Sequence, residues 1–207
     1  CLVDGAYLGI DQSGRQCDVA DHVFEYLGFL FTALRSLALR STRKEKLAFT
    51  LDDYDLDRFT TVAAQFGQRR YGYVVTPNAD HLIRLHREPT FRALYADAAY
   101  VLLDSRFISH LLRLTQKLRL PVCTGSDLTA KLFNDVITAD DAVVLIGGSA
   151  EQARCLRERH GLRQFAHFNP PMGFINDPAA VEQCLRFVEA HSPFRYCLLA
   201  VGAPQQE

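Results

Sequence analysis

The chain has 207 residues, of which 48% are hydrophobic and 23% are charged, and these values are ordinary for a soluble globular protein with a substantial core. Its formal net charge of −1 at pH 7 argues against a protein that binds nucleic acid broadly through phosphate contacts. The sequence contains no uncharged hydrophobic run of roughly 18 residues, so it predicts no membrane-spanning helix.

Residues 1–45 are predicted to form an extension that precedes the main domain. Residues 22–40 are hydrophobic over more than one helical stripe, Asp21 can cap their start, and basic residues follow up to Lys46. This pattern predicts an apolar helix. Two interpretations stay open: the helix packs on the domain or on a second subunit, or it lies on a membrane with its basic end facing anionic headgroups.

From residue 46 to residue 207 the hydrophobic pattern alternates between strands and helices. The predicted strands are 47–51, 71–76, 99–103, 121–123, 142–146, 165–168 and 196–201. The predicted helices are 58–68, 78–87, 90–98, 107–118, 126–138, 149–160 and 178–190. Strands separated by helices favour crossover connections, so the sequence predicts an α/β domain with a mostly parallel sheet flanked by helices.

Polar side chains follow three of the predicted strands directly. One strand runs into Asp104 and Arg106, another into Thr76 and Asn78, and the last into residues 202–207. Ligands of open parallel sheets bind at the carboxyl ends of the strands, so we expect the three ends to meet at one site. There Asp104 can act as a general base on a hydroxyl. The alternative for each strand end is a polar turn, a helix cap or an ion pair.

Two turns of small residues are candidates for phosphate binding. Gly147 and Gly148 join a strand to a helix, and the segment 125–127 begins another helix. Backbone N–H groups at a helix start attract anions, although a tight turn without a ligand remains an equal alternative. Glu151 and Gln152 occupy the later positions of a GxGxxG motif, which disfavours a nicotinamide-dependent oxidoreductase.

The sequence shows no spacing typical of a metal site or of a serine nucleophile. No histidine has another histidine or a cysteine three or four residues away, and GxSxG is absent. The acidic residues Asp52, Asp53 and Asp55 precede a predicted helix and are interpreted as a cap. Threonine, asparagine, glutamine and carboxylate groups suit a hydroxyl-rich ligand, and the glycine turns suit a phosphate. Together they predict a nucleotide-sugar ligand.

The cysteines and the two ends of the chain indicate its cellular setting. The six cysteines show no CxxC spacing, and Cys123, Cys155 and Cys197 stand among hydrophobic residues, which predicts buried thiols in a reducing compartment. The chain begins at Cys1 without a recognisable signal peptide and stops at Glu207, directly after a turn motif. We therefore expect a cytoplasmic protein and a trimmed piece of a longer chain.

From about residue 47 to residue 207 the sequence resembles the WecG/TagA/CpsF family of bacterial glycosyltransferases (glycosyltransferase family 26). Six motifs in order carry the resemblance: Thr76–Asp80, Leu103–Asp104, Gly125–Leu128, Leu145–Gly148, Pro170–Phe174 and Val201–Glu207. The resemblance implies a Rossmann-like α/β fold and an inverting transfer without metal or other cofactor. The implied donor is a UDP-sugar that carries an N-acetylmannosamine-type sugar, its uronic acid or a hexose. The implied acceptor is a polyprenyl-linked sugar at the inner face of the bacterial cell membrane, in surface or exopolysaccharide biosynthesis.

The resemblance also implies roles for individual residues. Asp104 matches the catalytic base, Thr76 and Asn78 match residues that line the donor pocket, and Gln206 matches the glutamine of the closing Pro-x-Gln-Glu motif. Without a metal, we assign Arg106 to the departing diphosphate. The other candidate substrate-binding residues belong to the same motifs: Gly125, Ser126, Asp127, Gly147, Gly148, Gly173, Gly202, Pro204 and Glu207.

Three differences from the family pattern motivate an alternative function. Ser105 stands where the family often has glycine, Gln205 stands where it often has lysine, and the family's basic C-terminal segment, which is linked to membrane attachment, is absent after Glu207. The alternative is a catalytically inactive nucleotide-sugar-binding scaffold in a polysaccharide assembly complex. In either case we expect a membrane surface as a partner and no nucleic acid, and homo-oligomers remain an open expectation.

Overall fold

The computed structural model describes residues 51–67 and 72–202. The predicted N-terminal helix, most of the first predicted strand, and Pro204, Gln206 and Glu207 lie outside these ranges. The described residues form seven α-helices, one short 3-10 helix and five strands, and every strand pair among them is parallel. The predicted fold class, a Rossmann-like α/β domain, is therefore confirmed.

The first sheet is short and leads directly to Asp104. Strand β1 (Val74–Val75) pairs in parallel with β2 (Tyr100–Val101). Hydrogen bonds continue the pairing beyond the ladder, because the Asp104 N–H donates to the Pro77 carbonyl at 3.0 Å. On the other side of this extended segment, the Cys123 N–H donates to the Leu103 carbonyl at 3.0 Å. The predicted strand at 121–123 is therefore an extended segment beside the sheet and not a regular strand.

The second sheet has the order β4-β3-β5 and is centred on the most hydrophobic strand of the chain. Its strands are β3 (Ala142–Gly147), β4 (Gln164–Phe168) and β5 (Tyr196–Ala200). Five successive residues of β3 are buried, which is the pattern of a parallel strand covered on both faces. β3 aligns Val144 with Ala166 of β4 and with Cys197 of β5.

Capping chemistry sets most of the helix boundaries. The helices are α2 (Leu56–Ala63), α3 (Ala79–Arg87), α4 (Pro89–Ala96), α5 (Arg106–Gln116), α6 (Gly125–Asp135), α7 (Ala150–His160), η1 (Phe174–Asn176) and α8 (Pro178–Ala190). The side chains of Asp55, Asn78 and Ser149 cap α2, α3 and α7. α6 begins one residue earlier than the predicted helix at 126–138, because Thr124, and not Ser126 or Asp127, is its cap.

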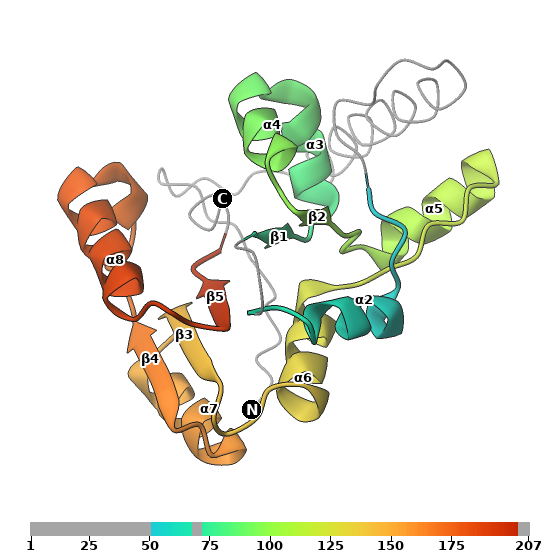
Figure 1. Cartoon of the computed structure of the whole chain (residues 1–207). Coiled ribbons are helices and arrows are strands. Elements are labelled where there is room, and N and C mark those ends of the chain that lie inside the picture. Colours follow the sequence, from blue (N-terminus) through green and yellow to red (C-terminus); the bar gives the residue numbers. More distant parts are fainter. Residues whose placement is uncertain (1–50, 68–71, 203–207) are drawn as a thin grey trace.

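Two hydrophobic clusters hold the elements together. One joins α3, α4 and α5 to the first sheet. The other joins α2 and α6 to both sheets, since Leu102, Val143 and Tyr196 are all buried in it. Figure 1 shows α3 and α4 beside the first sheet and α7 and α8 beside the second. The burial predicted for Cys155 is wrong, because α7 presents it outward; Cys123 is buried and Cys197 is half-buried.

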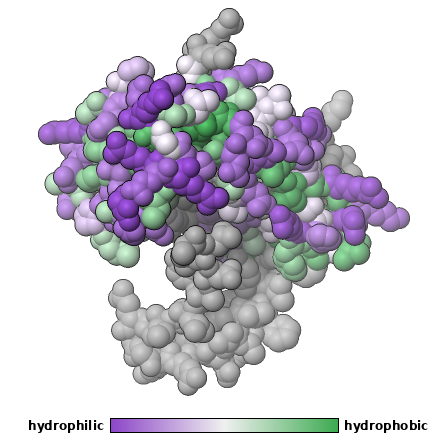
Figure 2. Space-filling model, turned by 90° about the horizontal axis from the view of Figure 1, so that it is seen from below, coloured by the Kyte–Doolittle hydropathy of each residue, from purple (hydrophilic) through white to green (hydrophobic). Residues whose placement is uncertain are grey.

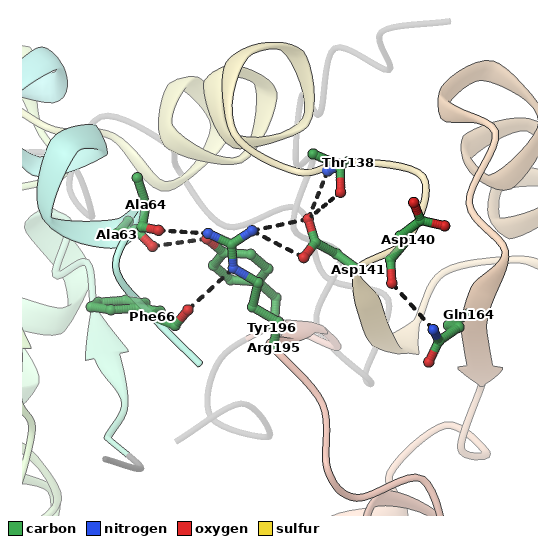
Figure 3. A network of polar contacts seen from close by, with 9 residues as sticks. All are labelled: Ala63, Ala64, Phe66, Thr138, Asp140, Asp141, Gln164, Arg195 and Tyr196. Atoms are coloured by element: carbon green, nitrogen blue, oxygen red, sulfur yellow. Dashed lines mark hydrogen bonds and ion pairs between the residues drawn. The ribbon is translucent and has the colours of Figure 1, made fainter. Parts of the chain in front are cut away.

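A polar network ties α2 to the beginnings of β3 and β5 (Figure 3). The Arg195 guanidinium donates to the carbonyls of Ala64 and Phe66 and to both carboxylate oxygens of Asp141, at 3.0 Å each for the latter. An open hollow of about 470 Å³ lies beside Arg195. It lies at the amino ends of the strands, at the opposite end of β3 from Gly147, and the Arg195 side chain there is already engaged.

The surface seen from below is mostly hydrophilic, with hydrophobic groups between the polar ones (Figure 2). Among the residues that the structure describes, no helix is long and apolar enough to cross a membrane.

Candidate active site

Three helices begin at the carboxyl edge of the first sheet. Asn78, Ser105 and Thr124 follow successive segments of this sheet, and their side chains accept the first free N–H groups of α3, α5 and α6. Asp104 lies among these helix starts, because its N–H contacts Pro77 and its carboxylate contacts Gly125. Three helix N-termini around one point favour negative charge there.

The structure brings together two of the three strand ends that we expected to meet. Residues 74–78 and 100–106 lie side by side, as the hydrogen bond from Asp104 to Pro77 requires. The third end follows β5, which belongs to the other sheet, and its residues 203–207 lie outside the described ranges.

The Asp104 carboxylate is half-buried and held by two donors. Its Oδ2 accepts the Gly125 N–H at 2.9 Å, and the Thr76 hydroxyl donates to the same carboxylate. Burial raises the pKa of Asp104 above its ordinary value, and the nearby charge of Asp127 adds to this effect. The hydrogen bonds from Gly125 and Thr76 oppose the rise without cancelling it. The result is an oriented carboxylate that binds a proton more readily than an exposed aspartate.

Gly125 permits the close approach between α6 and Asp104. A β-carbon at this position would lie 3.0 Å from Thr76 Oγ1 and 3.4 Å from Asp104 Oδ2. Any side chain there would press on both groups, whereas glycine lets its N–H reach the carboxylate. The motif Gly125–Leu128 is therefore explained at its first position by contact with Asp104, and not by helix capping.

His81 is a site residue that the sequence analysis did not identify. Asn78 Oδ1 accepts the His81 N–H at 3.1 Å, and His81 Nδ1 accepts the Asn78 N–H at 3.2 Å, which is a reciprocal capping box. Because Nδ1 is an acceptor, the neutral ring carries its proton on Nε2. Capping boxes usually use glutamate or glutamine at this position, so a histidine gave no recognisable signal.

Arg106 and Asp127 form an ion pair beside Asp104. The Arg106 Nη2 lies 2.7 Å from Asp127 Oδ2, and the two side chains are 74% and 42% exposed. An ion pair this exposed contributes little stability, so either partner can exchange it for another charge at small cost. Ser126 is exposed next to this pair, and its hydroxyl lies 3.2 Å from that of Thr124.

The turn at Gly147 and Gly148 follows β3 in the second sheet. Both residues have positive φ angles, +91° and +75°, and a β-carbon on Gly147 would lie 2.5 Å from the Ala200 carbonyl oxygen. His167 Nε2 lies 3.0 Å and 3.2 Å from the two glycine carbonyls, so it must donate a proton to them. No pattern in the sequence indicated His167 as a site residue. The Ser149 N–H already donates to the Gln152 side chain, and phosphate binding at this turn stays a prediction.

Gly173 and Gly202 are the remaining predicted site residues within the described ranges. Gly173 and Gly202 adopt left-handed φ angles of +75° and +73°, and nothing lies within 4 Å of a β-carbon built on either. Glycine at these two positions permits the left-handed backbone conformation. Within residues 51–67 and 72–202, no three histidine, cysteine, aspartate or glutamate side chains are grouped as a metal site requires.

Comparison with known proteins assigns the family. The Glycosyl transferase WecG/TagA/CpsF family matches residues 45–207, well over half of the chain. No curated protein matches the chain. The family match includes both sheets and the site around Asp104, and the chain therefore belongs to the WecG/TagA/CpsF family of glycosyltransferases.

Proposed function

We propose that this glycosyltransferase moves a sugar from a UDP-sugar to a hydroxyl of a polyprenyl-linked acceptor, with inversion and without a metal. The observation that carries the proposal is the half-buried Asp104 carboxylate, held by Gly125 and Thr76 at a strand end. Family membership supports the transferase class and its place in cell-surface polysaccharide biosynthesis.

Asp104 would act as the general base. It takes the proton of the acceptor hydroxyl while that oxygen attacks the anomeric carbon, and the bond from this carbon to the diphosphate breaks at the same time. A single displacement of this kind inverts the configuration. The two donors fix the carboxylate in one orientation, and its raised pKa makes it a stronger base than an exposed aspartate.

The departing diphosphate would be stabilised by the same edge of the sheet. The N-termini of α3, α5 and α6 favour negative charge there, and Arg106 can exchange Asp127 for a phosphate oxygen. Because Asn78 Oδ1 is engaged by His81, its contact with the donor sugar would fall to the amide NH₂. Ser105, the departure from the family's glycine, has a structural reason, since it caps α5.

The acceptor places the reaction at the inner face of the bacterial cell membrane, with this protein as a peripheral component. The transferred sugar would be of the N-acetylmannosamine type, a uronic acid or a hexose. These assignments come from the family resemblance, and the hydroxyl-rich chemistry of Thr76 and Asn78 agrees with a sugar ligand.

The test combines binding with turnover. Isothermal titration with UDP, a panel of UDP-sugars and NAD should show UDP-sugar binding and no NAD binding. Transfer to a soluble prenyl-diphosphate-sugar analogue should then give the inverted product. Donor binding without transfer to any acceptor would favour the scaffold alternative.

The metal-free mechanism makes a separate prediction. Turnover should be unchanged by EDTA, because the leaving group is stabilised by protein groups. A loss of turnover that an added divalent ion restores would overturn this part of the proposal.

A further inference from the structure

Helix α5 carries two adjacent stripes of side chains along its length. Residues spaced i, i+4, i+7 and i+11 lie on one side of a helix. The hydrophobic stripe of α5 consists of Phe107, Leu111, Leu114 and Leu118. The basic stripe of α5 consists of Arg106, His110, Arg113 and Lys117, each one residue earlier. The last residue of each stripe lies just beyond the helix end.

Most of the hydrophobic stripe lies outside the core of the domain, and only Leu111 packs partly against it. Leu114 is 78% exposed and Phe107 is 56% exposed, whereas Ile108 and Leu112 on another side of the same helix are 0% and 2% exposed. The helix therefore anchors itself through one side and leaves a second hydrophobic side uncovered. Figure 1 shows α5 extending away from the two sheets.

The charge around the stripe has one sign. From Ser105 to Cys123 every charged residue is basic, and Arg113, Lys117 and Arg119 are all exposed. This local excess stands against a net charge of −1 for the whole chain. A partner that is complementary to α5 therefore combines negative charge with an adjacent apolar surface.

A bilayer with anionic headgroups meets both requirements along the whole helix. A second copy of α5 would bring like charges together, and a nucleic acid offers phosphates but no apolar surface for Leu114. A single prenyl chain needs a groove, whereas the exposed side of a projecting helix is convex. We propose that α5 lies on an anionic lipid bilayer, with the hydrophobic stripe at the boundary of headgroups and acyl chains and with Arg113 and Lys117 of the basic stripe facing the headgroups.

This assignment rests on the proposed function and specifies how the active site would lie relative to the membrane. α5 begins two residues after Asp104, and Leu114 lies about 12 Å further along the helix axis. Docking through α5 would therefore bring the catalytic base close to the membrane surface, where a polyprenyl-linked acceptor exposes its sugar.

Vesicle cosedimentation of the full chain tests the proposal. Vesicles of phosphatidylcholine with about one third phosphatidylglycerol are compared with pure phosphatidylcholine. The wild-type chain should bind the anionic vesicles more strongly. Leu114→Ser should weaken this binding by about tenfold. Arg113→Glu should remove the preference for anionic vesicles. Leu185→Ser is the matched control, because Leu185 is 54% exposed on α8 and should be neutral.

The outcomes separate this inference from the proposed function. Transfer to the soluble acceptor analogue should persist in Leu114→Ser and Arg113→Glu, because neither residue lies in the site. Vesicle binding that is absent in the wild type, or unchanged in both α5 variants, would overturn the docking assignment. Vesicle binding through α5 without any sugar transfer would instead refute the proposed function and leave the docking assignment standing.

Discussion

The role proposed for Asp104 requires a carboxylate that can accept a proton, and a side chain of the same shape without this ability should not replace it. Asp104→Asn should reduce transfer by about 10²- to 10⁴-fold, because the amide cannot take a proton. Donor binding should stay close to wild type, since the amide oxygen still accepts the Gly125 N–H. Calorimetry with UDP-sugar and an initial-rate assay measure the two effects. Retained turnover in this variant would refute Asp104 as the base.

The pH dependence of transfer follows from the raised pKa of Asp104. Burial favours its protonated form, so kcat/KM should fall with decreasing pH at a midpoint above the ordinary value of 3.8. Asp127→Asn should move this midpoint downward, because it removes a neighbouring negative charge.

The raised pKa of Asp104 also affects stability. The folded state binds this proton more tightly than the unfolded state, so the ionised Asp104 carboxylate lowers the free energy of unfolding at pH values above its pKa. Asp104→Asn should consequently unfold no more easily than wild type at neutral pH.

At Gly125, the absence of a β-carbon allows helix α6 to approach Asp104 closely. Gly125→Ala places a methyl group 3.0 Å from Thr76 Oγ1, and the shift of the base that follows should lower kcat by about tenfold. The free energy of unfolding should hardly change, because alanine is the better helix former. Asn134→Ala, at an exposed position of the same helix, is the control and should alter neither quantity. Wild-type kcat in Gly125→Ala would show that the close approach has no catalytic role.

At the scale of elements, the start of α3 connects packing to the site. His81→Leu leaves the Asn78 N–H without its acceptor, so we expect a loss of about 1 kcal/mol in urea unfolding and a higher KM for the donor. His81→Gln should retain most of both, because Gln152 fills the equivalent position of the capping box at Ser149. Equal donor KM values for the two variants would contradict a positioning role for the capping box.

At the scale of the whole molecule, Arg195 joins segments that are distant in sequence. Its guanidinium contacts α2 and the beginning of β3, and its side chain is 24% exposed. Arg195→Ala should lower the free energy of unfolding by roughly 2–4 kcal/mol, because it removes the charged partner of Asp141 and leaves the carbonyls of Ala64 and Phe66 without their donor. Arg163→Ala is the control, since its ion pair with Asp140 is exposed and worth less than about 1 kcal/mol. Equal unfolding midpoints for the two variants would contradict a structural role for Arg195.

The same ion pair contributes to acid unfolding. Burial alone would raise the pKa of Asp141, but hydrogen bonds from Thr138 and Arg195 outweigh burial and lower it. This stability is present above the ordinary aspartate pKa and is lost as pH falls through the lower folded-state value. Arg195→Ala should therefore flatten the fall in stability below about pH 4.

Much of the fold could be predicted because its signals are local. Short hydrophobic runs between the helical segments predicted β3 and the other strands of the second sheet. The caps at Asn78 and Ser149 depend only on residues close by in the sequence. The motifs around Thr76 and Asp104 indicated the family for the same reason, since each is a short run of sequence. The start of α6 was predicted one residue late because Thr124, Ser126 and Asp127 could each act as its cap.

The sequence by itself determined the elements, their parallel arrangement and the family. Only the tertiary structure decided which groups touch, because the decisive contacts join residues far apart in the chain. Gly125 reaches Asp104 across 21 residues, His167 reaches Gly147 across 20, and Arg195 reaches Phe66 across 129. Such contacts depend on how strands and helices pack, and local residue preferences do not determine which distant segments pack together. The orientation of the Asp104 carboxylate and the exposed stripe of α5 are consequences of this packing.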